Sequence, residues 1–168
     1  RYIEKPMMIF LMTHLIQMKK KKRVLMSDFI AQCFYLASLA TVYPQPHRVD
    51  TCLEIVHESI KMDIDPYLAI ALAYHESRLD KSVVSPAGAV GAMQVMRKFI
   101  DCKNCTDIQA GLIALRYWLN RSGTVCDALG RYIVGTAGKC GKSSRAIIAL
   151  SRDLKCSGPK KKEFCYEC

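Results

Sequence analysis

The segment that most constrains the fold is an apolar run at residues 66–74, PYLAIALAY, which ends two residues before Glu76. A run that is apolar on nearly every side is typical of a helix buried in a domain core. Asp65 and Pro66 give this helix its start, because an aspartate caps free N–H groups and proline already has a helical φ. Helical spacing then places Glu76 on one face with four apolar residues, Leu68, Ala69, Leu72 and Ala73.

The carboxyl of Glu76 has two interpretations. If it is buried with the apolar face, desolvation disfavours its charged form, so its pKa rises and it keeps a proton near neutrality. A carboxyl of that kind suits general acid catalysis. If instead it lies at the open end of the helix, it is an ordinary solvated glutamate.

The residues after the helix favour the first interpretation. Residues 85–89, SPAGA, are turn material, and residues 91–94, GAMQ, add a second glycine and an amide. Glycines let the backbone approach a ligand closely. Gln94 offers both donors and an acceptor to a hydroxyl-rich substrate.

This part of the chain resembles the soluble lytic transglycosylases, relatives of goose-type lysozyme in the lysozyme-like superfamily. The flanking helices extend the likeness from about Thr51 to Leu154. The residues that carry it are Glu76-Ser77 and then Ser85-Pro86-x-Gly88-Ala89-x-Gly91-x-Met93-Gln94.

The resemblance implies a reaction that needs one glutamate and no metal or other cofactor. Glu76 would protonate the oxygen between N-acetylmuramic acid (MurNAc) and N-acetylglucosamine (GlcNAc). The same residue would then accept the proton of the muramyl C6 hydroxyl as that oxygen closes on C1, which gives a 1,6-anhydro sugar. A search for a second carboxylate, as retaining and inverting glycosidases require, finds only weak candidates, Asp80, Asp101 and Asp107.

The resemblance also implies roles for the residues around Glu76. Ser77 would orient Glu76 or contact the glycan, and Gln94 would bind the acetamido group. The family signature Tyr-Asn-x-Gly is Tyr132-Ile133-Val134-Gly135 here, so the asparagine is replaced by isoleucine. The substrate-binding residues expected are therefore Ser77, Ser85, Gly91, Met93, Gln94 and Tyr132.

The periodicity predicts an all-α, mainly helical fold with little or no sheet. Asp50 is expected to cap a helix that ends near Lys61, with Leu53, Val56 and Ile60 facing inward. A capping box at Thr106 and Gln109 opens a helix to about Asn120. Further helices are expected over residues 126–134 and from Ser143 or Ser144 to about Leu154. Inward positions of the 106–120 helix are Ile108, Leu112, Leu115 and Leu119, and it contains Gly111, where the resembled family also has a glycine in close packing.

The chain divides by composition into an N-terminal segment 1–43, a catalytic domain 44–154 and a basic, cysteine-containing tail 155–168. Residues 18–23, MKKKKR, precede an apolar run from Phe29 to Val42, which is typical of a secretory signal peptide cleaved after Ala40. Two alternatives are a retained membrane anchor over residues 24–42 and a segment packed into the structure.

Nine cysteines are present, and Cys33 alone lies in the predicted signal segment. The eight others form an even set, which in an exported domain indicates disulfides of unknown pairing. Zinc is the alternative, because Cys102-x-x-Cys105 and Cys165-x-x-Cys168 are knuckle-like pairs. Their separation is much larger than in a zinc ribbon.

The net charge of +10 indicates an anionic partner. An exported protein that acts on the anionic cell wall suits this charge, and no motif indicates a specific nucleic acid. The expected location is the periplasm or cell wall, with membrane anchoring or association with a virion as variants. Secretion, conjugation and phage-entry machines are all settings that fit. Two other functions stay open: a hydrolytic muramidase and a non-catalytic wall-binding or assembly component.

Overall fold

The computed structural model describes residues 26–40 and 45–157 of the chain. Residues 26–40 are helical, and a short 3-10 turn, η1, lies in the long connection after α3. Within the described residues the β-structure consists of two isolated antiparallel bridges, one between Val84 and Val90 and one between Val90 and Val95. The predicted all-α class is therefore confirmed. In chain order the elements are α2 (Pro46–Lys61), α3 (Pro66–Ser77), η1 (Arg97–Phe99), α4 (Asp107–Leu119), α5 (Val125–Val134) and α6 (Lys142–Cys156).

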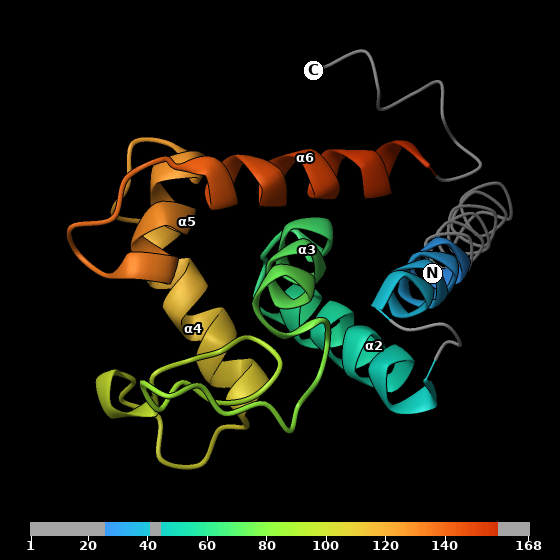
Figure 1. Cartoon of the computed structure of the whole chain (residues 1–168), viewed down its shortest axis with the longest axis horizontal. Coiled ribbons are helices and arrows are strands. Elements are labelled where there is room, and N and C mark those ends of the chain that lie inside the picture. Colours follow the sequence, from blue (N-terminus) through green and yellow to red (C-terminus); the bar gives the residue numbers. More distant parts are fainter. Residues whose placement is uncertain (1–25, 41–44, 158–168) are drawn as a thin grey trace, which may run out of the picture.

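Helix α3 is the centre of the molecule, with α6 crossing on one side and α2 on the other (Figure 1). It begins as its sequence predicts, because Pro66 occupies the first turn and an Asp65 carboxylate oxygen accepts a hydrogen bond of 3.0 Å from the Tyr67 N–H. Residues 68–73 are all buried. The apolar run of α3 is thus the core around which the other helices pack.

The C-terminal end of α3 turns sharply into the long connection. Arg78 and Leu79 both have positive φ, 58° and 66°. Leu79 is nevertheless fully buried, so its side chain anchors the turn in the core. This anchoring offsets the strain of a left-handed conformation at a non-glycine residue. The next segment can then fold back over the end of α3.

Helix α4 starts at the cap that the sequence indicates. The Thr106 hydroxyl accepts from the Gln109 N–H, and the Gln109 side chain accepts from the Thr106 N–H, which completes the predicted capping box. Gly111 of α4 packs on Met93, since a Cβ at Gly111 would lie 2.6 Å from the Met93 Cβ. This close packing was expected from the family resemblance. It joins α4 to the loop below the end of α3.

Two helix starts differ from the predictions. Helix α2 begins at Pro46, and Asp50 lies inside it instead of capping it. Its inward face is also rotated: Val56 is buried as expected, but Ile60 is 47% exposed. The face that packs inward is Val49, Cys52, Ile55, Val56 and Ser59. The small polar residues on that face allow close approach of the neighbouring helix, which an apolar pattern does not reveal.

Helix α6 begins at Lys142 after Gly141, without a side-chain cap. The expectation that Ser143 or Ser144 caps it is therefore wrong. Ser144 is buried inside the first turn instead. A serine at a helix start has the right chemistry for either position, so the packing of the turn decided between them.

The helix of residues 26–40 packs on α2 and α3 and shares their core. Phe29, Cys33, Leu36 and Ala37 are buried in the same cluster as α3. Cys33 forms a disulfide with Cys52 of α2, and the Phe29 and Tyr67 ring centroids lie 4.8 Å apart. Of the three interpretations of the N-terminal region, the described residues match the packed segment. Signal cleavage after Ala40 stays a prediction.

No helix in the described parts of the chain has the length and hydropathy needed to cross a membrane. The run 18–23 and residues 41–44, which follow the predicted cleavage site, lie outside the described residues. So does the tail from residue 158, with Cys165 and Cys168.

The disulfides correct one expectation about the cysteines. Cys33 was predicted to stand apart from the disulfide framework, but it is paired with Cys52. Cys126 pairs with Cys140, which joins α5 to the start of α6. Cys102 pairs with Cys105, so the first knuckle-like pair is joined internally.

Candidate active site

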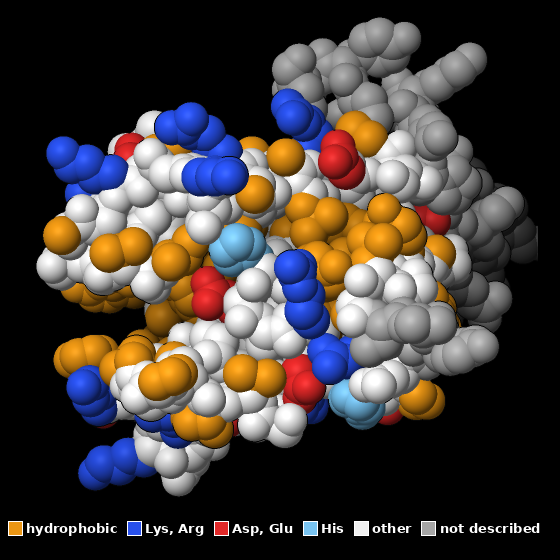
Figure 2. Space-filling model, in the orientation of Figure 1, with side chains coloured by type: hydrophobic (Ala, Val, Ile, Leu, Met, Phe, Trp, Pro, Cys, Tyr) orange, Lys and Arg blue, Asp and Glu red, His pale blue; other side chains and the backbone are white. Residues whose placement is uncertain are grey.

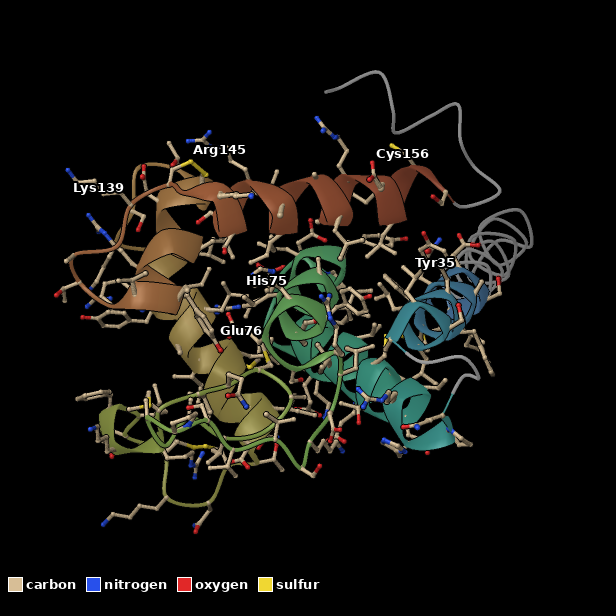
Figure 3. The ribbon with its side chains drawn as sticks, viewed as in Figure 1. Tyr35, His75, Glu76, Lys139, Arg145 and Cys156 are labelled. Atoms are coloured by element: carbon tan, nitrogen blue, oxygen red, sulfur yellow. A yellow bond between two sulfur atoms is a disulfide. The ribbon has the colours of Figure 1, made fainter. Side chains whose placement is uncertain are left out.

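Glu76 lies at the end of α3, on the side turned toward α4 and α5 (Figure 3). Its Oε1 atom is buried and has no hydrogen-bond partner among the residues that the structure describes. Burial alone raises the pKa of this carboxyl to about 7. Of the two interpretations of Glu76, the structure supports the desolvated acid. A carboxyl with that pKa can both donate and accept a proton near neutrality.

Tyr132 of α5 faces this carboxyl. Burial raises the pKa of the Tyr132 hydroxyl, and the negative charge of Glu76 raises it further. The hydroxyl donates a hydrogen bond of 2.8 Å to the Met93 carbonyl oxygen. Tyr132 therefore fixes the loop beside Glu76, and in this arrangement its proton is directed to the backbone instead of the carboxyl.

Ser77 joins the end of α3 to the same loop. Its hydroxyl donates to the Ala92 carbonyl oxygen at 2.7 Å and accepts from the Asp80 N–H at 3.0 Å. Both bonds are to the backbone, which satisfies this part-buried side chain. Ser77 thus positions the loop relative to Glu76 by holding the backbone on both sides of the turn.

Two of the residues expected to bind the glycan, Ser85 and Gln94, form hydrogen bonds to the backbone of the loop itself. The Ser85 hydroxyl accepts from the Ala89 N–H at 3.0 Å and closes a turn. Both donors of the Gln94 amide are used, on the carbonyl oxygens of Val83 and Gly91 at 3.0 and 2.9 Å. Toward a sugar, the Gln94 side chain is therefore left with its carbonyl oxygen as an acceptor.

Gly91 and Met93 shape the loop from inside. Gly91 has φ of +75°, and a Cβ there would lie 2.9 Å from the Asp107 Cβ, so both conformation and space require glycine. The Met93 side chain is fully buried. It forms part of the core under the loop, whereas the sequence placed it on the lining of a subsite.

Two of the three weak second-carboxylate candidates, Asp80 and Asp107, have cationic partners. Asp80 accepts from Arg48 at 2.9 Å, and hydrogen bonds from Ser82 lower its pKa first, with the charge of Arg48 contributing. An oxygen of Asp107 lies 3.7 Å from the Arg97 Nε. The neighbours of Asp80 thus favour its charged form. Glu76 differs from Asp80 because its environment favours the neutral form.

His75 is a neighbour of Glu76 that the sequence did not single out. Figure 3 shows the two labelled side chains next to each other at the end of α3. Burial, followed by the positive charge of Arg78, lowers the pKa of His75, so its imidazole is neutral near pH 7. The sequence did contain a signal for His75, because this histidine directly precedes Glu76 at the end of the predicted helix.

A hollow opens between α5 and the loops that follow α3 (Figure 2). Hydrophobic side chains lie along both of its sides. The C-terminal end of α5 exposes the hydrophobic residues Ile133 and Val134, and the loops expose Val84 and Phe99. Ile133, which replaces the family asparagine, is thus on the surface and packs no core.

The described residues contain no group of three or more His, Cys, Asp or Glu side chains arranged to hold a metal ion. At this site Glu76 is the carboxyl whose pKa lies near neutrality, and Tyr132 and Ser77 fix the loop beside it.

Comparison with known proteins gives one result that covers this whole site. Residues 55–136 match the family model of the transglycosylase SLT domain. The match includes α3, the loop after it, α4 and α5, and thus Glu76 and Tyr132. No curated protein and no solved structure was found to match the chain. The helical fold and the family match lead to one conclusion: residues 55–136 form a transglycosylase SLT domain, with the all-α fold of the lysozyme-like superfamily.

Proposed function

We propose that the protein is a peptidoglycan lytic transglycosylase that cleaves the β-1,4 bond between MurNAc and GlcNAc, with Glu76 as its single acid and base. The observation that carries the proposal is the buried Glu76 carboxyl, which lacks a hydrogen-bond partner at Oε1 and has a pKa of about 7. The SLT domain supports peptidoglycan as the substrate and, with it, the periplasm or cell wall as the place of action.

The reaction uses one carboxyl twice, first as a proton donor and then as a proton acceptor. Protonated Glu76 donates to the glycosidic oxygen as the C1–O bond breaks and GlcNAc leaves. The C6 hydroxyl oxygen then attacks C1, and its proton passes to the Glu76 carboxylate, which restores the acid. The product is 1,6-anhydroMurNAc, and no water is consumed. A pKa near neutrality serves both steps, because neither the donor nor the acceptor form is strongly disfavoured.

The surrounding residues support this cycle by holding the site rigid. Ser77 and Tyr132 fix the backbone on both sides of the Ala92–Met93 peptide. The Gln94 carbonyl oxygen is the atom of its side chain that can accept from the acetamido N–H of the substrate. We also propose Ser85 and Gly91 as residues that shape the subsite through the backbone, and Met93 as its support from below.

Digestion of purified peptidoglycan followed by mass spectrometry of the muropeptides tests the proposal. We expect the parent protein to release chains ending in 1,6-anhydroMurNAc. We expect the Glu76→Gln variant to lose at least about a hundredfold in rate, the usual contribution of a positioned general acid. Glu54→Gln is the matched control, because Glu54 forms a surface ion pair with Lys81 outside the site.

Two results would replace the proposal. Reducing ends one water heavier than the anhydro product would identify a hydrolytic muramidase. Equal release by the parent protein and Glu76→Gln would remove Glu76 from the mechanism and favour a non-catalytic wall-binding component.

A further inference from the structure

The loop before α4 contains a disulfide, Cys102–Cys105, whose cysteines are separated by only 3 positions in the sequence. The other two disulfides between described residues have separations of 19 and 14. A disulfide stabilises a fold mainly by restricting the unfolded chain, and the restriction grows with the length of the loop that it closes. Cys102–Cys105 therefore contributes the least of the three to stability, and its presence in the loop calls for another explanation.

A guanidinium group lies against this disulfide. The Arg97 Nη1 atom is 3.1 Å from the Cys105 Sγ atom, and Nη2 donates a hydrogen bond of 3.2 Å to the Cys102 carbonyl oxygen. A positive charge at this distance stabilises the thiolate that forms at Cys105 when the S–S bond breaks. Both cysteines are only partly buried, so a reductant can reach them. An accessible disulfide with a stabilised leaving thiolate is of the labile kind that exchanges with other thiols.

We propose that Cys102–Cys105 is a thiol–disulfide exchange site that takes a dithiol as its reductant. A thiolate of the dithiol attacks the Cys102 sulfur, the S–S bond breaks, and Cys105 leaves as a thiolate beside Arg97. The second thiolate of the dithiol then attacks the mixed disulfide at the reductant's own sulfur, which releases Cys102 as a thiolate. Two electrons pass from the dithiol to the protein, and the dithiol becomes a disulfide. Its two protons pass to the solvent or to the released cysteines.

Arg97 also connects this disulfide to the loop beside Glu76. Its Nε atom is 3.7 Å from the Asp107 Oδ1 atom. The Gly91 backbone packs on Asp107, because a Cβ at Gly91 would lie 2.9 Å from the Asp107 Cβ. The Gly91 carbonyl oxygen in turn accepts a hydrogen bond of 2.9 Å from the Gln94 amide. Both loops lie at the N-terminal end of α4 (Figure 1), so a change at the disulfide reaches the loop of Gly91 and Gln94 through one side chain.

Reduction changes the partners of Arg97. The Cys105 thiolate carries a full negative charge and competes with the Asp107 carboxylate for the guanidinium. Opening the ring also releases the Cys102 carbonyl oxygen from its fixed place. The loop beside Glu76 is then held less firmly, and glycan binding weakens. This consequence rests on the proposed function, whereas the exchange chemistry does not.

A redox titration of the full chain, purified with its disulfides intact, tests the exchange chemistry. The protein is equilibrated with reduced and oxidised dithiothreitol in defined ratios, and free thiols are alkylated. Mass spectrometry of the peptides then gives the reduced fraction of each pair. We expect Cys102–Cys105 to be reduced at a lower ratio of dithiol to disulfide than Cys33–Cys52, whose two residues are 0% exposed.

Arg97→Gln tests the guanidinium, and Lys98→Gln is its matched control. Arg97→Gln removes the charge at Cys105, so half reduction should require about tenfold more dithiol, equal to about 30 mV, since a hydrogen bond to a charged group contributes at least that much. Arg97→Lys keeps a positive charge and should lie between Arg97→Gln and the parent. Lys98→Gln removes the adjacent charge, whose Nζ lies over the Phe99 ring at 5.0 Å from its centroid. We expect it to titrate as the parent does.

Muropeptide release tests the connection to the active site. At a dithiol ratio that reduces Cys102–Cys105 alone, we expect release from dilute peptidoglycan to fall about two- to fivefold, because a surface ion pair such as Arg97–Asp107 contributes no more than that. Release at saturating peptidoglycan should change less, since the reduced enzyme keeps Glu76. The Cys102→Ser/Cys105→Ser variant has no such pair to reduce, so its release should not respond to the dithiol.

Three results would overturn this proposal. Reduction of Cys33–Cys52 at the same or a lower dithiol ratio would show that the loop pair is an ordinary structural disulfide. Equal titrations of Arg97→Gln, Lys98→Gln and the parent would remove the guanidinium from the exchange. Unchanged release from a protein whose loop pair is shown to be reduced would refute the connection to the active site. A parent protein that releases no anhydro ends would contradict the proposed function instead, and the thiol titration would still report on the exchange site.

Discussion

The stability of the protein should depend on pH through Glu76, and the Glu76→Gln substitution isolates that dependence. The pKa of this carboxyl is about 7 in the folded protein, against about 4.3 in an unfolded chain. The folded state therefore holds its proton where the unfolded state has lost it. Stability is highest below about pH 4 with respect to this group, and it falls as pH rises until the folded carboxyl has also ionised, near pH 7.

The size of the effect follows from the two pKa values. One tenfold change in a proton equilibrium is about 1.4 kcal/mol, so ionised Glu76 reduces the free energy of unfolding by about 3.6 kcal/mol at pH 8. Glutamine has nearly the same shape and no charge. We therefore expect Glu76→Gln to be about 3.6 kcal/mol more stable than the parent at pH 8 and nearly equal to it at pH 4.

Denaturant unfolding followed by circular dichroism, with the disulfides intact, measures this difference at intervals between pH 4 and pH 8. In thermal unfolding the same difference corresponds to a Tm increase of roughly 7–14 °C at pH 8 for a chain of this size. Other titrating groups, including His75, are present in both proteins and cancel in the difference. Glu54→Gln is the control, because its partly exposed carboxylate pairs with Lys81 at the surface and should change stability little.

The result that would refute this reasoning is a constant difference between the two proteins. If the stability of Glu76→Gln and of the parent changes in parallel from pH 4 to pH 8, the carboxyl is solvated and is no pre-set general acid. A loss of activity without this pH signature would then point to a structural role for Glu76.

Two further predictions concern the surroundings of the site. Tyr132→Phe leaves the Met93 carbonyl oxygen without the Tyr132 donor, so we expect the free energy of unfolding in denaturant to fall by about 1–3 kcal/mol. We also expect muropeptide release to fall, but by less than Glu76→Gln causes. If neither quantity changes, the positioning role of Tyr132 is contradicted. Gly130→Ala places a Cβ 2.0 Å from the Lys139 carbonyl oxygen, and the backbone movement required should cost about 3 kcal/mol or more. Gly123→Ala has no neighbour within 4 Å and should leave the unfolding midpoint nearly unchanged; equal effects of the two glycine substitutions would refute the packing argument.

The starts of two helices could be predicted from the sequence, because capping residues determine them locally. The start of α3 depends on Asp65 and Pro66, and the start of α4 depends on the capping box at Thr106. These signals act within one helical turn, so sequence alone suffices to interpret them. The apolar run of α3 likewise identified the buried helix and placed Glu76 at its end.

The face of α2 could not be determined in the same way. Its inward side includes Ser59 and excludes Ile60, because contacts with α3 and α4 decide which side is covered. The pairing of Cys33 with Cys52 has the same origin. It depends on two helices meeting, and a count of cysteines carries no information about that meeting.

For the active site, the sequence determined the residue types and their order, from Glu76 through Gln94 to Tyr132, and the SLT family match covers this whole stretch. Only the tertiary structure decided what these residues do. Burial between helices raises the pKa of Glu76, and the fold of the loop occupies the Gln94 donors and covers Met93. Solvation and hydrogen bonding depend on atoms brought together from distant parts of the chain, and those distances exist only once the chain has folded.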